Sequence, residues 1–244
     1  MKRLLLLAMV ISQFLSADSV STIYVPHLAD GGGWQTVFTI VNLSGNSADG
    51  TLRFHAEDGS PLALPLAGST TGPISTLAIS VPANGILVLE TSGKSSGTVT
   101  GWAELILPIS NSLAISTIFR QHVDQRPDFE ASVLASPVIT KPLTFPFDNS
   151  AGAATGMAVI NESPLNAGTI AVTIRDGLGQ LLLADTITLG PGNHVSFSLS
   201  ARYPTLSGQQ GTITLSPDYA TWLGAVAFRF NPTGPFTTLA PLVR

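Results

Sequence analysis

The side chains that could do chemistry in this sequence are few and widely separated. Its four histidines are His27, His55, His122 and His194, and no two have the spacing that places metal ligands on one face of a helix. His27 and Asp30 could contact one ion, although a surface histidine is the simpler interpretation. No Gly-x-Ser-x-Gly nucleophile sequence occurs. We therefore predict no catalytic residue from these patterns.

The carboxylates were considered as a glycosidase pair, because that reaction needs two acids across a cleft. Glu57-Asp58 and Asp176 fall in matching turns, where Asp favours the turn backbone. Glu90 and Glu104 fall on expected strands of the first half, and Glu104 could form a cross-strand ion pair with Arg120. Two acids facing each other in a cleft at roughly 5–10 Å would favour a hydrolase.

A glycine-rich run, "LADGGGWQT" at 28–36, has neither the lysine nor the following helix of a phosphate loop. We interpret it as a turn whose glycines permit positive φ, with Trp34 covering the end of the fold. Asp30 and Asp148 recur beside such runs and are weak calcium candidates, because calcium takes six to eight oxygen ligands. No metal or other cofactor is predicted.

The aromatic residues raise a second kind of site. Trp34 and Trp102 are possible ligand contacts, and clustering on one flat face with polar groups would favour sugar binding. Aromatic residues make up only 7% of the chain, so core or rim packing is the default interpretation.

Self-similarity organises the chain. "VFTIVNLSGNSADGTLRFHAEDGSPL" (37–62) matches "GMAVINESPLNAGTIAVTIRDGLGQLL" (156–182), and this places Asn42 on Asn161. The pair Phe119-Arg120 falls on Phe228-Arg229, each 11 residues after a proline. This is an internal duplication. Because these positions occur in both copies, we expect them to serve the shared fold, with each Asn bonding the turn backbone at a strand end.

Short apolar runs alternate with Gly, Pro, Asn and Asp turns, which is typical of an all-β protein. We predict two tandem immunoglobulin- or fibronectin-like β-sandwiches, at 18–137 and 138–244, joined by a short Pro-containing linker. The expected strands are 22–28, 35–43, 50–57, 74–81, 85–91, 98–106 and 112–120 in the first copy. Those of the second copy are 143–147, 154–161, 168–175, 181–188, 193–199, 211–215 and 222–230. One helical turn is expected near 200–203.

The N-terminus predicts export. Lys2 and Arg3 precede an apolar run that ends near Ala17, so residues 1–17 read as a signal peptide, too short to span a bilayer. Without Lys2 and Arg3, nine basic residues remain against 15 acidic ones, a net charge of −6, which disfavours a nucleic-acid partner. We expect a secreted protein, extracellular or periplasmic, that is not membrane-spanning after signal removal and contains no cysteine.

Several motifs carry a resemblance to a known family: "ADGGGW", "FRQ" followed by "FEASVLASP", and "FRFNPTGPFTTLAPL". With these the sequence resembles a family of uncharacterised exported bacterial proteins over most of its mature length. Matching positions are Asp30 to Trp34, Phe119-Arg120, Phe129-Glu130, Phe147-Asp148-Asn149 and Phe228 to Gly234. The resemblance implies tandem β-sandwiches at the cell exterior and implies no reaction.

The leading hypothesis is a secreted, non-catalytic interaction or structural protein. It would present loops 28–35, 67–76 and 121–130 to an envelope, matrix or protein partner. The alternative is a carbohydrate-binding accessory protein, and a hydrolase comes third. Fold alone does not choose among them, because β-sandwiches host all three.

Overall fold

The computed structural model describes residues 20–108 and 112–243, and it shows an all-β chain built from four antiparallel sheets. The expected signal peptide, residues 1–17, lies outside the described residues. The first half contains β1 (Val20–Asp30), β2 (Trp34–Asn42), β3 (Ala48–Ala56), β4 (Thr76–Val81), β5 (Ile86–Glu90), β6 (Val99–Pro108), β7 (Leu113–Gln121) and β8 (Phe129–Val133).

The second half is composed of nine strands and two short helical turns. They are β9 (Leu143–Asp148), β10 (Ala154–Asn161), β11 (Gly168–Asp176), β12 (Leu181–Leu189), β13 (His194–Ser198), α1 (Leu199–Arg202), η1 (Pro204–Leu206), β14 (Gln210–Pro217), β15 (Leu223–Phe230), β16 (Phe236–Leu239) and β17 (Leu242–Val243).

Alternation of apolar and polar residues explains why these segments form strands with one buried face. In β3, Leu52 and Phe54 are fully buried while Arg53 between them is exposed. In β11, Ile170, Val172 and Ile174 are buried in the same way. Successive side chains of a strand point to opposite faces, so this period of two directs one row into the core.

The strand order repeats between the two halves. In the first half the sheets are β1-β6-β3-β4 and β5-β2-β7-β8, and in the second they are β9-β14-β11-β12, extended by β17, and β13-β10-β15-β16. Counted within each half, both place the first, sixth, third and fourth strands in one sheet. A constant-type immunoglobulin domain instead places its first, second, fifth and fourth strands together. The shared feature is therefore two packed antiparallel sheets, and the strand order differs.

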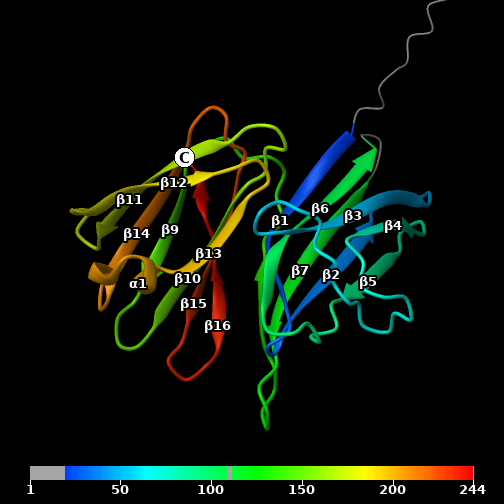
Figure 1. Cartoon of the computed structure of the whole chain (residues 1–244), viewed down its shortest axis with the longest axis horizontal. Helices are drawn as coiled ribbons and strands as arrows, with labels where there is room; N and C mark the ends of the chain where they lie inside the picture. Colours follow the sequence, from blue (N-terminus) through cyan, green and yellow to red (C-terminus); the bar gives the residue numbers. More distant parts are fainter. Residues whose placement is uncertain (1–19, 109–111, 244) are drawn as a thin grey trace, which may run out of the picture.

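The two halves lie side by side with β1, β10 and β15 between them (Figure 1). One core cluster fills the space between the sheets of the second half. The core of the first half continues into the second through Ala158, Val226, Phe228 and Phe236. The halves therefore share buried apolar surface as well as a chain connection. The connecting segment bonds to both, because Ser136 pairs with Tyr24 and the Ile139 carbonyl accepts the Leu223 amide at 2.8 Å.

All the strands expected from the sequence are present with small shifts at their ends, and the helical turn is α1. The strands that the sequence did not predict are β8, β16 and β17, which have only five, four and two residues. β16 and β17 carry few residues for a periodic signal, whereas β8 alternates Phe129, Ala131 and Val133 with polar residues, a signal that the sequence reasoning missed. Two of them matter for the assembly, because β8 and β16 lie against each other across the interface, where the Thr238 hydroxyl bonds the Ser132 carbonyl.

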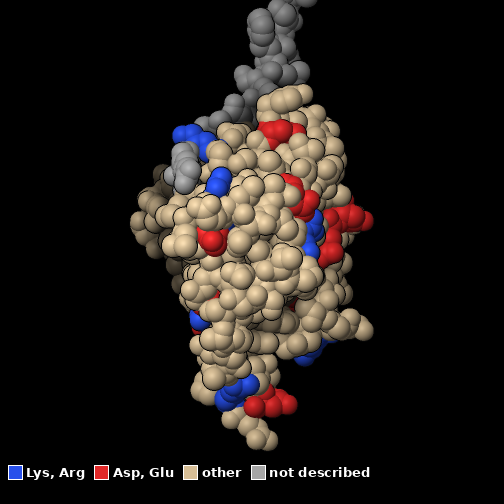
Figure 2. Space-filling view, turned by 90° about the vertical axis from the view of Figure 1, so that its left-hand side faces the viewer, with Lys and Arg blue, Asp and Glu red and all other residues tan. Residues whose placement is uncertain are grey.

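The surface has few charges. Figure 2 shows acidic and basic side chains singly or in small mixed groups on the face it presents, as expected for a chain with 11% charged residues. Within 20–108 and 112–243, no helix has the length and hydrophobicity needed to cross a membrane.

Candidate functional site

The duplicated Phe-Arg positions meet at the interface between the halves. Phe119 on β7 and Phe228 on β15 stack on each other with ring centroids 5.4 Å apart. Trp34 stacks on the other side of Phe119 at 4.4 Å, and Phe236 meets both phenylalanines edge-on at 5.9 Å. One position in each half therefore supplies the ring that joins the two.

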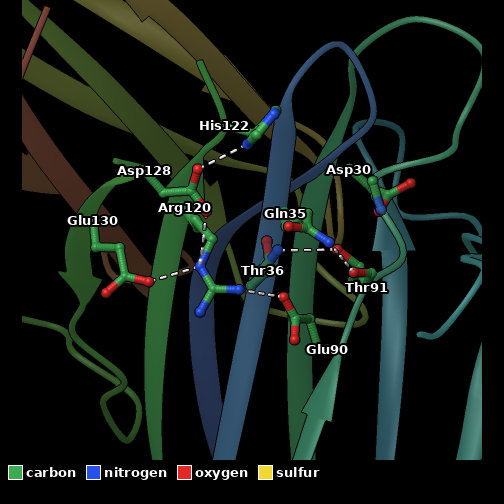
Figure 3. A network of polar contacts seen from close by, with 10 residues as sticks. Asp30, Gln35, Thr36, Glu90, Thr91, Arg120, His122, Asp128 and Glu130 are labelled. Carbon is green, nitrogen blue, oxygen red and sulfur yellow. Dashed lines mark hydrogen bonds and ion pairs between the residues drawn. The ribbon is translucent and has the colours of Figure 1, made fainter. Parts of the chain in front are cut away.

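The arginine that follows Phe119 organises a polar network on the first half (Figure 3). Arg120 donates from Nε to Glu130 at 2.6 Å and from Nη1 to Glu90, and Asp128 lies 4.0 Å away. The hydrogen bond to Glu130 raises the pKa of Arg120. His122 bonds the same Asp128 at 2.8 Å. Each charge has an opposite partner, so the network ties β5, β7 and β8 together.

The expected pairing of Arg120 with Glu104 is wrong. Glu104 lies on β6 in the other sheet of the first half. There it pairs with His55 at 3.1 Å and with Arg53 at 3.6 Å. β6 and β7 follow each other in the chain but lie in different sheets, because β6 pairs with β3 and β1, and β7 pairs with β2 and β8.

Arg229, the second-half counterpart of Arg120, binds a different partner. Its Nε donates to Asp148 at 2.8 Å. Asp148 also accepts the Ser150 hydroxyl at 2.7 Å and the Gln210 amide at 3.0 Å, and these hydrogen bonds hold its pKa well below the ordinary value. The two arginines occupy one position of the repeat, yet each is neutralised by local acids.

Asp30 and Asp148, the two calcium candidates, lie in different halves and already accept donors. Asp30 is fully buried, and its two oxygens take the backbone amides of Gly93 and Ser95 at 2.6 and 3.0 Å. Within the described ranges, no three His, Cys, Asp or Glu side chains are grouped to hold a metal ion. The adjoining Gly31 has φ of 80°, and a Cβ there would come within 2.2 Å of the Gly97 carbonyl. The glycine run thus makes room for the 93–97 loop.

Asn42 and Asn161 make equivalent bonds in the two halves. Asn42, at the end of β2, donates from Nδ2 to the carbonyls of Asn46, Val81 and Pro82 at 2.8–3.0 Å. Asn161, at the end of β10, donates to the carbonyls of Asn166, Leu189 and Gly190 at 2.8–3.4 Å. Both amides are buried, so each clamps a turn to the neighbouring sheet.

The two tryptophans proposed as ligand contacts lie in different cavities. Trp34 lines an apolar cavity of about 250 Å³ between the halves, together with Phe119, Phe228 and Phe230. Trp102 lines a larger and more polar space of about 580 Å³, also between the halves. We call the second space the interface cleft. The residues lining it are Val20, Thr22, Tyr24, Arg53, His55, Gly59, Trp102, Glu104, Val138, Glu162, Pro164, Pro191, Gly192 and Trp222.

Side chains from both halves build the interface cleft. Trp102 is only 4% exposed, and its indole donates across the interface to the Gly192 carbonyl at 2.9 Å. One face of its ring is covered by His55, at 4.0 Å between centroids and 13° between planes. Trp222, from the second half, is partly exposed. The cleft therefore has a fixed aromatic wall on one side and an accessible indole on the other.

The least expected group in the cleft is Glu162, which directly follows β10. It is 2% exposed, and neither carboxyl oxygen has a hydrogen-bond partner among the described residues. Burial raises its pKa well above the ordinary value. Tyr24 feels the same environment, because burial and the nearby Glu162 and Glu104 raise its pKa to about 12. The low polarity around Glu162 therefore favours the protonated form of its carboxyl.

Sequence reasoning missed Glu162, although the repeat contained a signal. The residue after Asn42 in the first half is Leu43, which is 69% exposed. The corresponding residue after Asn161 is the buried Glu162. A position that is an exposed apolar residue in one copy and an acid in the other is not required by the shared fold.

A second buried polar contact joins the halves. His27 on β1 and His194 on β13 stack with centroids 5.3 Å apart, and their ring nitrogens Nδ1 and Nε2 lie 3.2 Å apart. Burial lowers the pKa of His27 to about 4, and burial together with His27 lowers that of His194. Both rings are therefore neutral near pH 7, one donating and the other accepting.

Comparisons with protein-family models, with curated proteins and with solved structures found no match for this chain.

Proposed function

We propose that this chain is an exported, non-catalytic interaction or structural protein of the bacterial cell exterior. In this proposal it consists of two tandem β-sandwiches of duplicated origin, related to immunoglobulin and fibronectin domains in their two-sheet outline. The N-terminal signal pattern and the absence of cysteine support export from a bacterium. The resemblance to a family of exported bacterial proteins is part of the same proposal.

The observation that carries the proposal is that the repeated Phe and Arg positions make structural contacts. Phe119 and Phe228 join the halves, and Arg120 and Arg229 are each neutralised by neighbouring acids. These contacts fix two halves into one body rather than assemble reacting groups. A body of this kind holds its loops at fixed distances from one another, as an adhesive or matrix protein requires.

The loops proposed for partner contact differ in how they are held. Arg126 and Phe129 of the 121–130 segment contact the second half, because Arg126 bonds the Thr233 carbonyl at 3.3 Å and Phe129 lies against Gly234. Asp124, at the tip, is almost fully exposed. The 67–76 loop lies away from the interface and is mostly exposed. We propose that the partner is bound by the 67–76 loop and the tip near Asp124.

Sugar binding through Trp34 and Trp102 has weaker support. A stacking platform needs ring faces open to the ligand, whereas Trp34 packs on Phe119 and Trp102 packs on His55. The hypothesis of a hydrolase is supported by one observation, that Glu104 and Glu162 line the same cleft. We keep both as outcomes of the test.

The test is retention of the purified exported chain on intact bacterial cells, peptidoglycan and insoluble polysaccharides. We expect saturable retention on cells that is lost when the cells are treated with protease. A variant with Thr70→Lys and Thr71→Lys, which adds two long charged side chains to this exposed loop, should bind less, and Trp34→Leu should bind unchanged if it folds. Retention on one glycan, competed by its soluble oligosaccharide, would replace this proposal with carbohydrate binding.

A further inference from the structure

The interface cleft has an imbalance of charge that the fold does not account for. Glu104 is matched inside the protein, because Arg53 and His55 both contact it. Glu162 has no such partner. The other charged or titratable groups lining the cleft are Tyr24 on β1, Arg53 and His55 on β3, and Glu104 on β6. None of these forms a hydrogen bond or ion pair with Glu162 among the described residues.

Local structure holds the Glu162 carboxyl in place. The backbone amide of Glu162 donates to the Trp222 carbonyl at 2.7 Å, which fixes the end of β10 beside β15. A Cβ on Gly224 would approach Glu162 Oε1 to 2.3 Å, so the carboxyl occupies space that any other residue at 224 would fill. The chain thus makes room for a carboxyl that then has no partner, and leaving a buried polar group unpaired is unfavourable.

The surroundings indicate what would satisfy this carboxyl. Two further aromatic side chains, Tyr24 and the partly exposed Trp222, line the same cleft, and aromatic rings attract organic cations. A primary ammonium group supplies three N–H donors and a positive charge, and bonds between ionised partners are the strongest available. An anion would meet two acids, and a neutral sugar would find the face of Trp102 covered by His55.

We propose that the interface cleft binds the primary ammonium group of an organic ligand, with the carboxylate of Glu162 as its counter-ion and Tyr24 and Trp222 as its aromatic surround. The salt bridge requires the ionised form of Glu162, so a proton that the carboxyl carries in the free protein passes to the solvent. The ammonium group can belong to a free amine or to a lysine side chain. This site is separate from the loops proposed for partner contact.

The experiment is isothermal titration calorimetry of the exported chain with three five-carbon probes. They are 1,5-diaminopentane, 1,5-pentanediol and glutarate, which share length and differ in charge. We expect the diamine to bind about tenfold or more tightly than the diol, and glutarate not to bind. Nα-acetyl-lysine amide keeps the free side-chain ammonium group. As a second amine, it tests whether a lysine side chain enters the cleft.

Glu162→Gln is the decisive variant, because it keeps the shape of the side chain and removes its charge. We expect it to lose about tenfold or more in diamine affinity. Asp176→Asn, which removes one negative charge at the end of β11 and outside the residues that line the cleft, is the matched control and should bind as the parent does. Trp222→Leu, at a partly exposed position, should weaken diamine binding while the Glu162 carboxyl stays in place. Melting curves of each variant verify folding.

Proton release gives a readout that folding does not affect. Repeating the titration at pH 7 in two buffers with different ionisation enthalpies should show net proton release when the diamine binds, and no such release in Glu162→Gln. Equal affinity for diol and diamine would overturn the proposal in favour of a polyhydroxyl ligand. Unchanged binding by Glu162→Gln, or no binding of either amine, would also overturn it. The calorimetric results do not depend on the proposed function, because a chain that is not retained on cells can still bind the diamine in the cleft.

Discussion

Acidification should weaken the chain through the histidine pair at the interface. The folded protein keeps His27 neutral to about pH 4, whereas the unfolded chain takes up a proton near pH 6.5. Where the unfolded state binds more protons, stability falls as the pH falls. The contribution is therefore complete above about pH 6.5 and is lost as the pH drops from there toward 4.

The size of the effect follows from the two pKa values. The whole interval from 6.5 to about 4 corresponds to about 3 kcal/mol for His27. At pH 5.0 the loss is about 2 kcal/mol relative to pH 7.5, and His194 adds to it in the same direction. Carboxylates with low pKa values, such as Asp148, contribute little at pH 5.0 because their unfolded forms are still ionised. Glu162 acts with the opposite sign, since its raised pKa favours the folded state as the pH falls.

The assay is urea unfolding at pH 7.5 and pH 5.0, for the parent chain and for His27→Gln. Gln keeps a polar contact for His194 and cannot take up a proton. The difference between the two pH values should be smaller in His27→Gln by about 2 kcal/mol, and the contribution of Glu162 cancels in this comparison. An identical pH dependence in His27→Gln and the parent would refute the reasoning.

Three further changes test the contacts of the fold. Phe228→Ala should lower the free energy of unfolding by about 3–5 kcal/mol, because it removes the ring that joins the halves; a loss under 1 kcal/mol in urea unfolding would contradict this. Asn161→Ala should cost about 2–3 kcal/mol by leaving three carbonyls without their donor, with the exposed Asn46→Ala as its control. Arg229→Ala should lower the free energy of unfolding by about 1 kcal/mol, since its bond to Asp148 is partly exposed. Retention on cells should be unchanged. An unchanged melting temperature together with lost retention would show that Arg229 belongs to a binding site instead.

The sequence was informative where the signal is local. Period-two alternation located the longer strands, because in a strand such as β3 the large apolar residues are the buried ones and the polar residues are more exposed. The repeat pointed to Asn42 and Asn161 as turn residues, and both bond turn carbonyls. These features depend on neighbours a few residues away or on the comparison of two copies.

The rest depends on how the halves dock, which no local pattern encodes. His27 and His194 are 167 residues apart, and each alone resembles a surface histidine. Trp102 bonds Gly192 across the same interface. The pairing of Glu104 failed for a related reason, because the order of strands in a sheet is not the order in the chain. Glu162 lies buried in the cleft only because both halves enclose it.

The central claim is that this chain binds without catalysing a reaction. The most direct measurement incubates the purified chain with peptidoglycan, polysaccharides and cell-surface protein, and records bound chain and soluble fragments in the same samples by mass spectrometry. We predict saturable binding with no fragments beyond those in a control without the chain. Fragments that accumulate with time, and that disappear in a Glu104→Gln or Glu162→Gln variant that still folds, would contradict the claim and make the cleft an active site.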